Sequence, residues 1–89
     1  MIALRDLEIL TAAMEGIGFH LTRSEPGTMD SGVAEFSDGK RTITIGKDKS
    51  IWEFSGPRSH LEPLGLWRGF ADTNEFRNAL VSYVKQTVA

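Results

Sequence analysis

The sequence contains no cysteine, which excludes a disulfide framework and any cysteine-ligated metal site. It also lacks a run of about 18 apolar residues, the length that a membrane-spanning helix needs. Positive charge is not in excess, because ten lysines and arginines face twelve acids and the net charge is −2. A nucleic-acid-binding domain normally carries a clustered basic face. Metal, membrane and nucleic acid are therefore not the partners that the composition favours.

Residues 1–10 carry an early acid and lack both a continuous apolar stretch and a small-residue cleavage site. We therefore expect no secretion signal, and the cytoplasm is the expected compartment. The 89 residues are 40% hydrophobic and 25% charged, an ordinary globular composition. Because so short a chain has room for one shared core, we expect a single small domain over residues 1–89.

Amphipathic helices are predicted near both ends of the chain. The first, over residues 3–16, is indicated by apolar residues at helical spacing: Leu7, Leu10, Met14 and Ile17. The second, over residues 73–87, carries the stripe Phe76, Leu80, Tyr83 and Val84. Asp72 is its predicted N-cap, and Glu75 three positions later completes a capping-box pattern.

Four short alternating runs between these helices predict strands over residues 19–23, 32–37, 40–46 and 51–55. Asp38-Gly39 predicts a two-residue hairpin turn, and 47–50 a second turn. One face of the predicted sheet is apolar: Phe19, Leu21, Ala34, Phe36, Ile43, Ile45, Trp52 and Phe54. The predicted fold class is α+β in the order α-β-β-β-β-α, a four-stranded antiparallel meander with both helices on one sheet face.

Residues 56–71 contain two prolines and three glycines, yet they are too apolar for a flexible linker. We predict a long ordered loop with room for one helical turn, packed across an end of the domain. Tryptophan and arginine are frequent at binding hot spots. The candidate interaction surface is the set Arg58, His60, Trp67, Arg68 and Phe70. For Trp67 an equally good alternative is a core position that closes the end of the sheet.

A second candidate set consists of the basic residues Lys40, Arg41, Lys47 and Lys49, on one predicted hairpin. These side chains are candidates for phosphate contacts, which attract nucleic acid without reading its sequence. The alternative, which we favour, is that lysines at turns and strand ends keep a sheet edge soluble.

Catalytic and metal-ligating residues are not indicated. His20 is expected on the polar sheet face, and His60 lies beside Ser59 and Glu62 without a nucleophile-elbow motif. Sequence adjacency alone does not build a relay, so a small enzyme using His60 with Glu62 or Arg68 ranks last. The acids are not spaced as a calcium loop, and 65–69 matches no phosphate-loop fingerprint. We therefore expect no metal and no cofactor.

The order of helix, meander and helix is similar to that of double-stranded-RNA-binding domains and of the small HicA-type RNase toxins. The stretch Met14–Phe19 leading to Arg23 resembles the helix-to-strand transition of the toxins. The catalytic histidine that follows a Gly-Ser pair in that family has no counterpart in Pro26–Gly32. The lysine cluster that starts the last helix of the RNA binders is replaced by Asp72–Glu75. The likeness extends over about residues 5–45 and establishes no family.

These observations favour a small non-catalytic binding or regulatory protein, such as an adaptor, inhibitor or accessory subunit. The expected partner is another protein or a second copy of the chain in a homodimer. The first alternative is a nucleic-acid-binding or RNase-type domain, and the second is the small enzyme based on His60.

Overall fold

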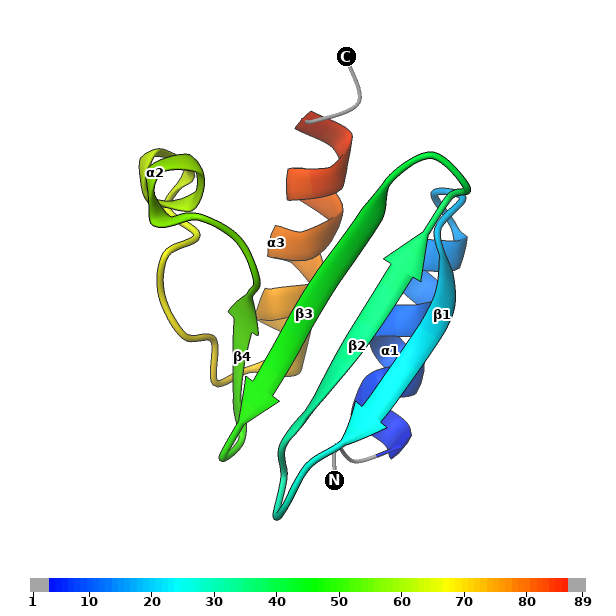
Figure 1. Ribbon diagram of the computed structural model, residues 1–89, viewed down its shortest axis with the longest axis vertical. Helices are drawn as coiled ribbons and strands as arrows, with labels where there is room; N and C mark the ends of the chain where they lie inside the picture. The colour runs from blue at the N-terminus through cyan, green and yellow to red at the C-terminus, as the bar shows by residue number, and fades with distance from the viewer. Residues whose placement is uncertain (1–3, 87–89) are drawn as a thin grey trace.

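A computed structural model describes residues 4–86 and confirms the predicted α+β class (Figure 1). Its elements in chain order are α1 (Leu4–Glu15), β1 (His20–Pro26), β2 (Gly32–Ser37), β3 (Thr42–Asp48), β4 (Ile51–Phe54), α2 (Arg58–Leu61), the 3-10 helix η1 (Glu62–Leu64) and α3 (Thr73–Gln86). Residues 3 and 87, the outermost positions of the two predicted helices, lie outside the described residues.

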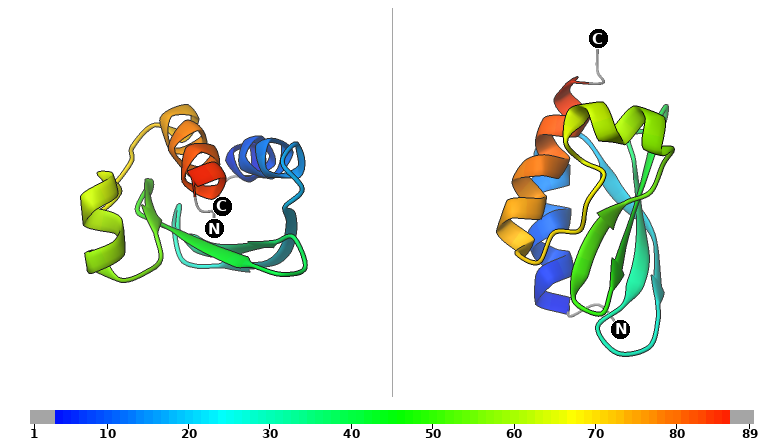
Figure 2. Two further views of the ribbon diagram at one scale, coloured as in Figure 1. Left: turned by 90° about the horizontal axis from the view of Figure 1, so that it is seen from above. Right: turned by 90° about the vertical axis from the view of Figure 1, so that its left-hand side faces the viewer.

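The four strands form one antiparallel sheet in the order β1-β2-β3-β4, which confirms the predicted meander. Helices α1 and α3 lie side by side on one face of this sheet, as predicted (Figure 2). None of the described helices covers the opposite face, and α2 lies beside β4 (Figure 1). The molecule therefore has two layers and one open sheet face.

The core lies between the helices and the sheet, and the alternation of apolar residues in the strands explains it. Six residues of the predicted apolar face are buried: Phe19, Ala34, Phe36, Ile45, Trp52 and Phe54. Leu21 and Ile43 are partly buried and pack against these six. The helices add Leu10 and Met14 from α1, and Phe76, Leu80 and Val84 from α3. Both predicted helical stripes therefore face the core.

The predicted two-residue turn at Asp38-Gly39 is wrong, because the β2–β3 connection has four residues, 38–41. The Asp38 carboxylate accepts the backbone N–H groups of Arg41 (2.8 Å) and Lys40 (2.9 Å), which stabilises the wider loop. These two bonds, the one from Arg41 first, lower the pKa of the exposed Asp38 carboxyl.

The two-residue turn lies instead between β3 and β4, where Lys49 and Ser50 have φ angles of 48° and 71°. Neither residue type favours the left-handed region. A contact from the β1–β2 loop holds this turn: Ser50 donates its backbone N–H to the Asp30 carbonyl (3.0 Å) and its hydroxyl to the Asp30 carboxylate (2.8 Å). This loop is shorter than predicted, because β1 continues to Pro26.

Helix α3 begins at the predicted N-cap, where the backbone N–H of Glu75 donates to the Asp72 carboxylate (3.0 Å). The other half of the predicted capping box is wrong. The Glu75 side chain forms an ion pair with Arg68 instead. This ion pair connects α3 to the segment that precedes it.

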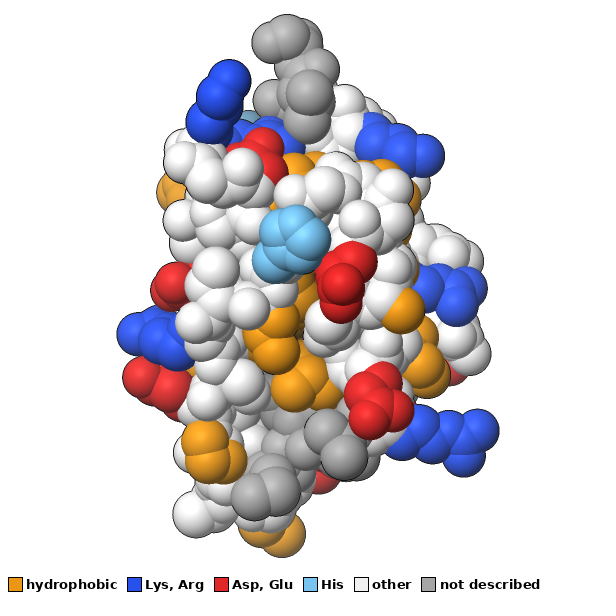
Figure 3. Space-filling view, turned by 90° about the vertical axis from the view of Figure 1, so that its right-hand side faces the viewer, with side chains coloured by type: hydrophobic (Ala, Val, Ile, Leu, Met, Phe, Trp, Pro, Cys, Tyr) orange, Lys and Arg blue, Asp and Glu red, His pale blue; other side chains and the backbone are white. Residues whose placement is uncertain are grey.

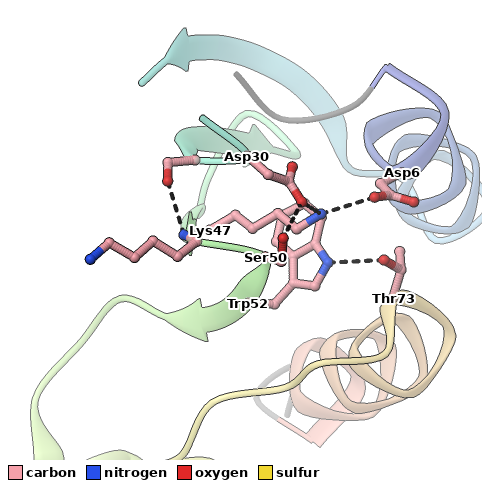
Figure 4. A network of polar contacts seen from close by, with 8 residues as sticks. Asp6, Asp30, Lys47, Ser50, Trp52 and Thr73 are labelled. Carbon is pink, nitrogen blue, oxygen red and sulfur yellow. Dashed lines mark hydrogen bonds and ion pairs between the residues drawn. The ribbon is translucent and has the colours of Figure 1, made fainter. Parts of the chain in front are cut away.

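Lys47 is the one buried charged residue among residues whose burial is described, with 6% of its surface exposed (Figure 4). Its Nζ lies 2.9 Å from Asp6 Oδ2 in α1 and 2.9 Å from Asp30 Oδ2 in the β1–β2 loop. The same ammonium group lies 4.8 Å from the ring centroid of Trp52. Because side chains alternate along β3, Lys47 follows Ile45 onto the inner face. Its prediction as an exposed phosphate contact is therefore wrong.

Two opposing influences act on the pKa of Lys47. Burial is the largest single one and lowers the pKa, because it disfavours the charged form. The hydrogen bonds and charges of Asp6 and Asp30 together outweigh burial, so the pKa lies above its ordinary value of 10.5. The ammonium group is therefore an internal cation that joins α1, the β1–β2 loop and β3.

We expect Lys47→Met to lower the free energy of unfolding by about 2–4 kcal/mol at neutral pH, because it leaves two partly buried carboxylates without their cation. A raised native pKa means that the stabilisation is complete below pH 10.5 and is lost as the pH rises through the native pKa. Urea unfolding from neutral pH to about pH 12 should therefore show a steeper loss for the wild type than for the variant.

Lys40→Met, at an exposed loop position, is the matched control and should follow the wild-type curve. Parallel pH profiles for the wild type and Lys47→Met would contradict this account of the buried ammonium group.

Candidate functional site

The segment between β4 and α3 is ordered, as predicted, and contains one turn of α-helix (α2) followed by η1. It then returns along β4, where Trp52 and Phe70 exchange both of their backbone N–H···O bonds at 2.8 Å. This bridge extends the sheet by one residue on the far side of β4. The segment is therefore part of the fold and not a flexible linker.

Two buried side chains anchor this segment at either end. Leu61, at the end of α2, is 1% exposed and Phe70 is 2% exposed. Gly65 between them has a φ of +75° and donates its N–H to the Glu62 carbonyl (3.0 Å), which ends η1. These two anchors and this turn fix the two ends and the middle of the stretch that carries the exposed residues between them.

Leu64 and Trp67 lie on this anchored stretch and are 42% and 47% exposed. They are two of the three exposed large hydrophobic residues in the described chain, and the third is Met29 in the β1–β2 loop. The alternative that Trp67 closes the core is therefore wrong. Phe70 has that role, since its ring packs against Phe54 (6.0 Å) and Phe76 (5.3 Å).

The structure brings three of the five predicted interaction residues to one exposed surface. The Arg58 guanidinium lies 5.9 Å from the ring centroid of Trp67 and pairs with Glu62 at 2.6 Å. Arg68 lies over the Phe70 ring at 3.8 Å. We call Arg58, Leu64, Trp67 and Arg68 the Trp67 surface. Leu64 was not predicted, and its only signal in the sequence is an apolar residue next to a turn glycine.

The other two predicted residues lie outside the Trp67 surface. His60 is exposed and its ring meets Tyr83 edge-on at 5.9 Å. Phe70 is buried, so its prediction as a surface residue is wrong; it supports the surface from beneath through its ring and its backbone.

A hollow of about 260 Å³ opens beside the Trp67 surface, lined by Glu53, Phe54, Leu66, Trp67, Arg68 and Gly69. Extending the Trp52–Phe70 bridge by one residue places Gly69 opposite Glu53, so both residues line the hollow from neighbouring segments. Glu53 was not among the predicted site residues. Its only signal is its outward position between two buried aromatic residues of β4.

The predicted phosphate contacts are not brought together. Lys40 and Arg41 lie before the first residue of β3, whereas Lys49 follows its last residue, so the whole length of the strand separates them. Arg41 lies 5.2 Å from the Phe19 ring and donates to the Val84 carbonyl (3.3 Å). Lys47 is buried, so these four residues do not form one basic surface.

The geometry does not build a catalytic or metal site around His60. Glu62 binds Arg58 and Arg68 binds Glu75, so the proposed helpers of His60 are engaged with other residues. Among residues 4–86, no three histidine, aspartate or glutamate side chains are grouped closely enough to hold a metal ion.

The helices between residues 4 and 86 include none with the length and hydrophobicity that a membrane span requires.

We expect Gly69→Ala to destabilise the protein by about 1–3 kcal/mol, because a Cβ at this position overlaps Cγ2 of Ile51. Gly46→Ala is the control, since its Cβ meets only the Gly32 carbonyl oxygen at 3.7 Å, an ordinary contact. Urea unfolding of both variants measures the difference. In an Ile51→Ala background the cost of Gly69→Ala should fall, and equal costs in both backgrounds would contradict the packing assigned to Gly69.

Comparison of the chain with protein-family models, with curated proteins and with solved structures finds no match in any of the three.

Proposed function

We propose that this protein is a non-catalytic binding protein that acts through protein–protein contact at the Trp67 surface. The observation that supports this most is that Leu64 and Trp67 stay 42% and 47% exposed on a segment anchored by buried residues at both ends. Single exposed hydrophobic residues are common on protein surfaces. Here Trp67 and Arg68 line a hollow and Arg58 lies against the Trp67 ring, and tryptophan and arginine are the residue types that dominate binding energy at interfaces.

Preorganisation adds to this argument. The bridge between Trp52 and Phe70, the turn at Gly65 and the ion pair between Arg68 and Glu75 hold the segment before any partner arrives. A partner therefore does not have to order this loop, and less of the contact energy is lost to conformational entropy.

The opposite side of the molecule, formed by α1 and β1, offers less for a partner to bury. Hydrophobic side chains form a narrow strip there, bordered by charged and polar groups (Figure 3). Where burial is described, the large hydrophobic residues of these elements and of their connection are at least partly buried, among them Leu7, Ile17 and Leu21. This side lacks an exposed aromatic residue comparable to Trp67 in the described chain.

Neither alternative function gains a specific supporting observation. The basic residues Lys40 and Lys49 lie at opposite ends of β3, and the start of α3 carries the acids Asp72 and Glu75. We therefore do not propose nucleic-acid binding or catalysis at His60.

Selection from a library of displayed random peptides tests the proposal without knowledge of the natural partner. We expect the wild-type protein to enrich peptides whose affinity falls at least tenfold with Trp67→Ala and severalfold with Leu64→Ala. Biolayer interferometry with purified variants measures these affinities, and thermal unfolding confirms that each variant is folded.

Met29→Ala is the matched control, because Met29 is 78% exposed but lies on the β1–β2 loop. Its affinities should equal those of the wild type. Enriched peptides that bind Trp67→Ala as tightly as the wild type would refute the Trp67 surface as the binding site, as would a failure to enrich any peptide.

A second copy of the chain is one kind of protein partner. Sedimentation equilibrium of the wild type and Trp67→Ala identifies this case, since a homodimer built on the Trp67 surface becomes monomeric in the variant. A dimer that persists in Trp67→Ala would mean that self-association uses another surface.

A further inference from the structure

The hollow beside β4 contains one carboxylate, that of Glu53, for which the described residues provide no ion-pair partner. Among residues 4–86, no cation lies within ion-pair distance of Glu53, whose side chain is exposed. The other charged residue of the lining, Arg68, is paired with Glu75 and stacked on Phe70. The net charge available to a ligand at the hollow is therefore negative.

Trp67, in the wall of the hollow, is a second group that favours a bound cation. Trp67 already lies beside the Arg58 guanidinium within the chain, at 5.9 Å from the ring centroid. An aromatic ring attracts a cation through the negative potential over its face, and a guanidinium stacks there with little loss of hydration. Glu53 and Trp67 thus offer a carboxylate and a ring on the walls of the same hollow.

The open sheet face continues this negative surface away from the hollow. Strand register places Glu25, Val33, Gly46 and Glu53 in one row across this face. The next row contains Arg23, which pairs with Glu25 and Glu35 at 3.4 Å each. With Asp48 included, one arginine faces four carboxylates for a net charge of −3. A field of this sign attracts basic partners and repels acidic ones.

The size of the hollow argues for a side chain over a free small molecule. Sites for small molecules and cofactors usually enclose about 300–1,000 Å³. The hollow has about 260 Å³ and opens at the surface. One long side chain carried by a partner protein can fill such a space, with its methylene groups against Leu66 and Trp67.

We propose that the hollow binds an arginine side chain of the partner protein, with the guanidinium on the Glu53 carboxylate and against the Trp67 ring. This inference rests on the proposed function, because it assigns the chemistry of the partner that the Trp67 surface would bind. Arginine fits better than lysine, since its planar group can both pair with a carboxylate and stack on an aromatic ring.

The test is an NMR titration of the wild-type protein with a blocked peptide of one arginine between glycines, followed at the indole N–H of Trp67. We expect a saturable shift at low salt, and no saturable shift with the same peptide carrying citrulline, the neutral analogue of arginine. Glu53→Gln, which keeps the shape and removes the charge, should weaken the affinity about fivefold.

Glu8→Gln is the matched control, because Glu8 is an exposed acid on α1, away from the hollow. The affinity of this variant for the arginine peptide should equal that of the wild type. Equal affinity of Glu53→Gln and the wild type would overturn the inference. So would saturable binding of the citrulline peptide, or no saturable shift up to the solubility limit of the arginine peptide.

The peptides selected by display separate this inference from the proposed function. Trp67-dependent peptides that are enriched in arginine and weakened by Glu53→Gln support both. Trp67-dependent peptides without arginine overturn the arginine site and leave the proposed function standing. Loss of all Trp67 dependence overturns the proposed function itself.

Discussion

The indole of Trp52 stacks on the ring of Phe76 with their centroids 5.3 Å apart and their planes at 7°, and its Nε1–H donates to Thr73 Oγ1 at 3.1 Å. The ammonium group of Lys47 also lies against this ring, and the backbone of Trp52 forms two hydrogen bonds with that of Phe70. Strands β3 and β4, helix α3 and the returning segment therefore meet at this one fully buried residue. The place of the Trp67 surface relative to the sheet depends on it, because the backbone of Trp52 holds Phe70 and Phe70 lies three residues from Trp67.

Cations and acids differ in how many partners they have within the molecule. Several cations are held by groups within the molecule: Lys47 by two aspartates, Arg41 by a helix carbonyl and a ring, and Arg58 and Arg68 by glutamates and rings. On the open sheet face, in contrast, Arg23 pairs with Glu25 and Glu35, and no ion pair among the described residues involves Asp48 or Glu53. The face that meets solvent is thus more acidic than a net charge of −2 for the whole chain suggests. Composition alone does not describe what a partner encounters.

Patterns with a short period predicted most of the fold. The helical stripes and the alternation in the strands identified the buried faces, because these periods follow from backbone geometry alone. The position of the tight turn could not be predicted locally. Asp38 stabilises a wider loop through its own backbone contacts, whereas Asp30, twenty residues away, holds Ser50 in its turn conformation. Lys47 was expected in a turn over residues 47–50, whereas β3 continues to Asp48 and carries it onto the inner face, and both of its carboxylate partners are distant in sequence.

In the candidate site, too, residue type identified some of the residues, and contacts between segments distant in sequence determined the others. Arg58, Trp67 and Arg68 were selected from residue type, and the structure brings them to one surface. Phe70 and Trp67 are both aromatic and lie three residues apart, so the sequence held no means of deciding which of the two enters the core. The backbone bridge to Trp52 decides it for Phe70. Glu53 joins the site only because the chain returns along β4, which no local pattern indicates.

The strand order β1-β2-β3-β4 has a consequence for how the chain reaches this structure. Every strand pairs with its neighbour in sequence across a connection of two to five residues, so the sheet assembles from successive hairpins with little loop-closure entropy. The packing of α1 on α3 joins the two ends of the chain and carries the largest such cost. The sheet therefore depends on short-range closures throughout, whereas the helical layer above it depends on a contact between segments from opposite ends of the described chain.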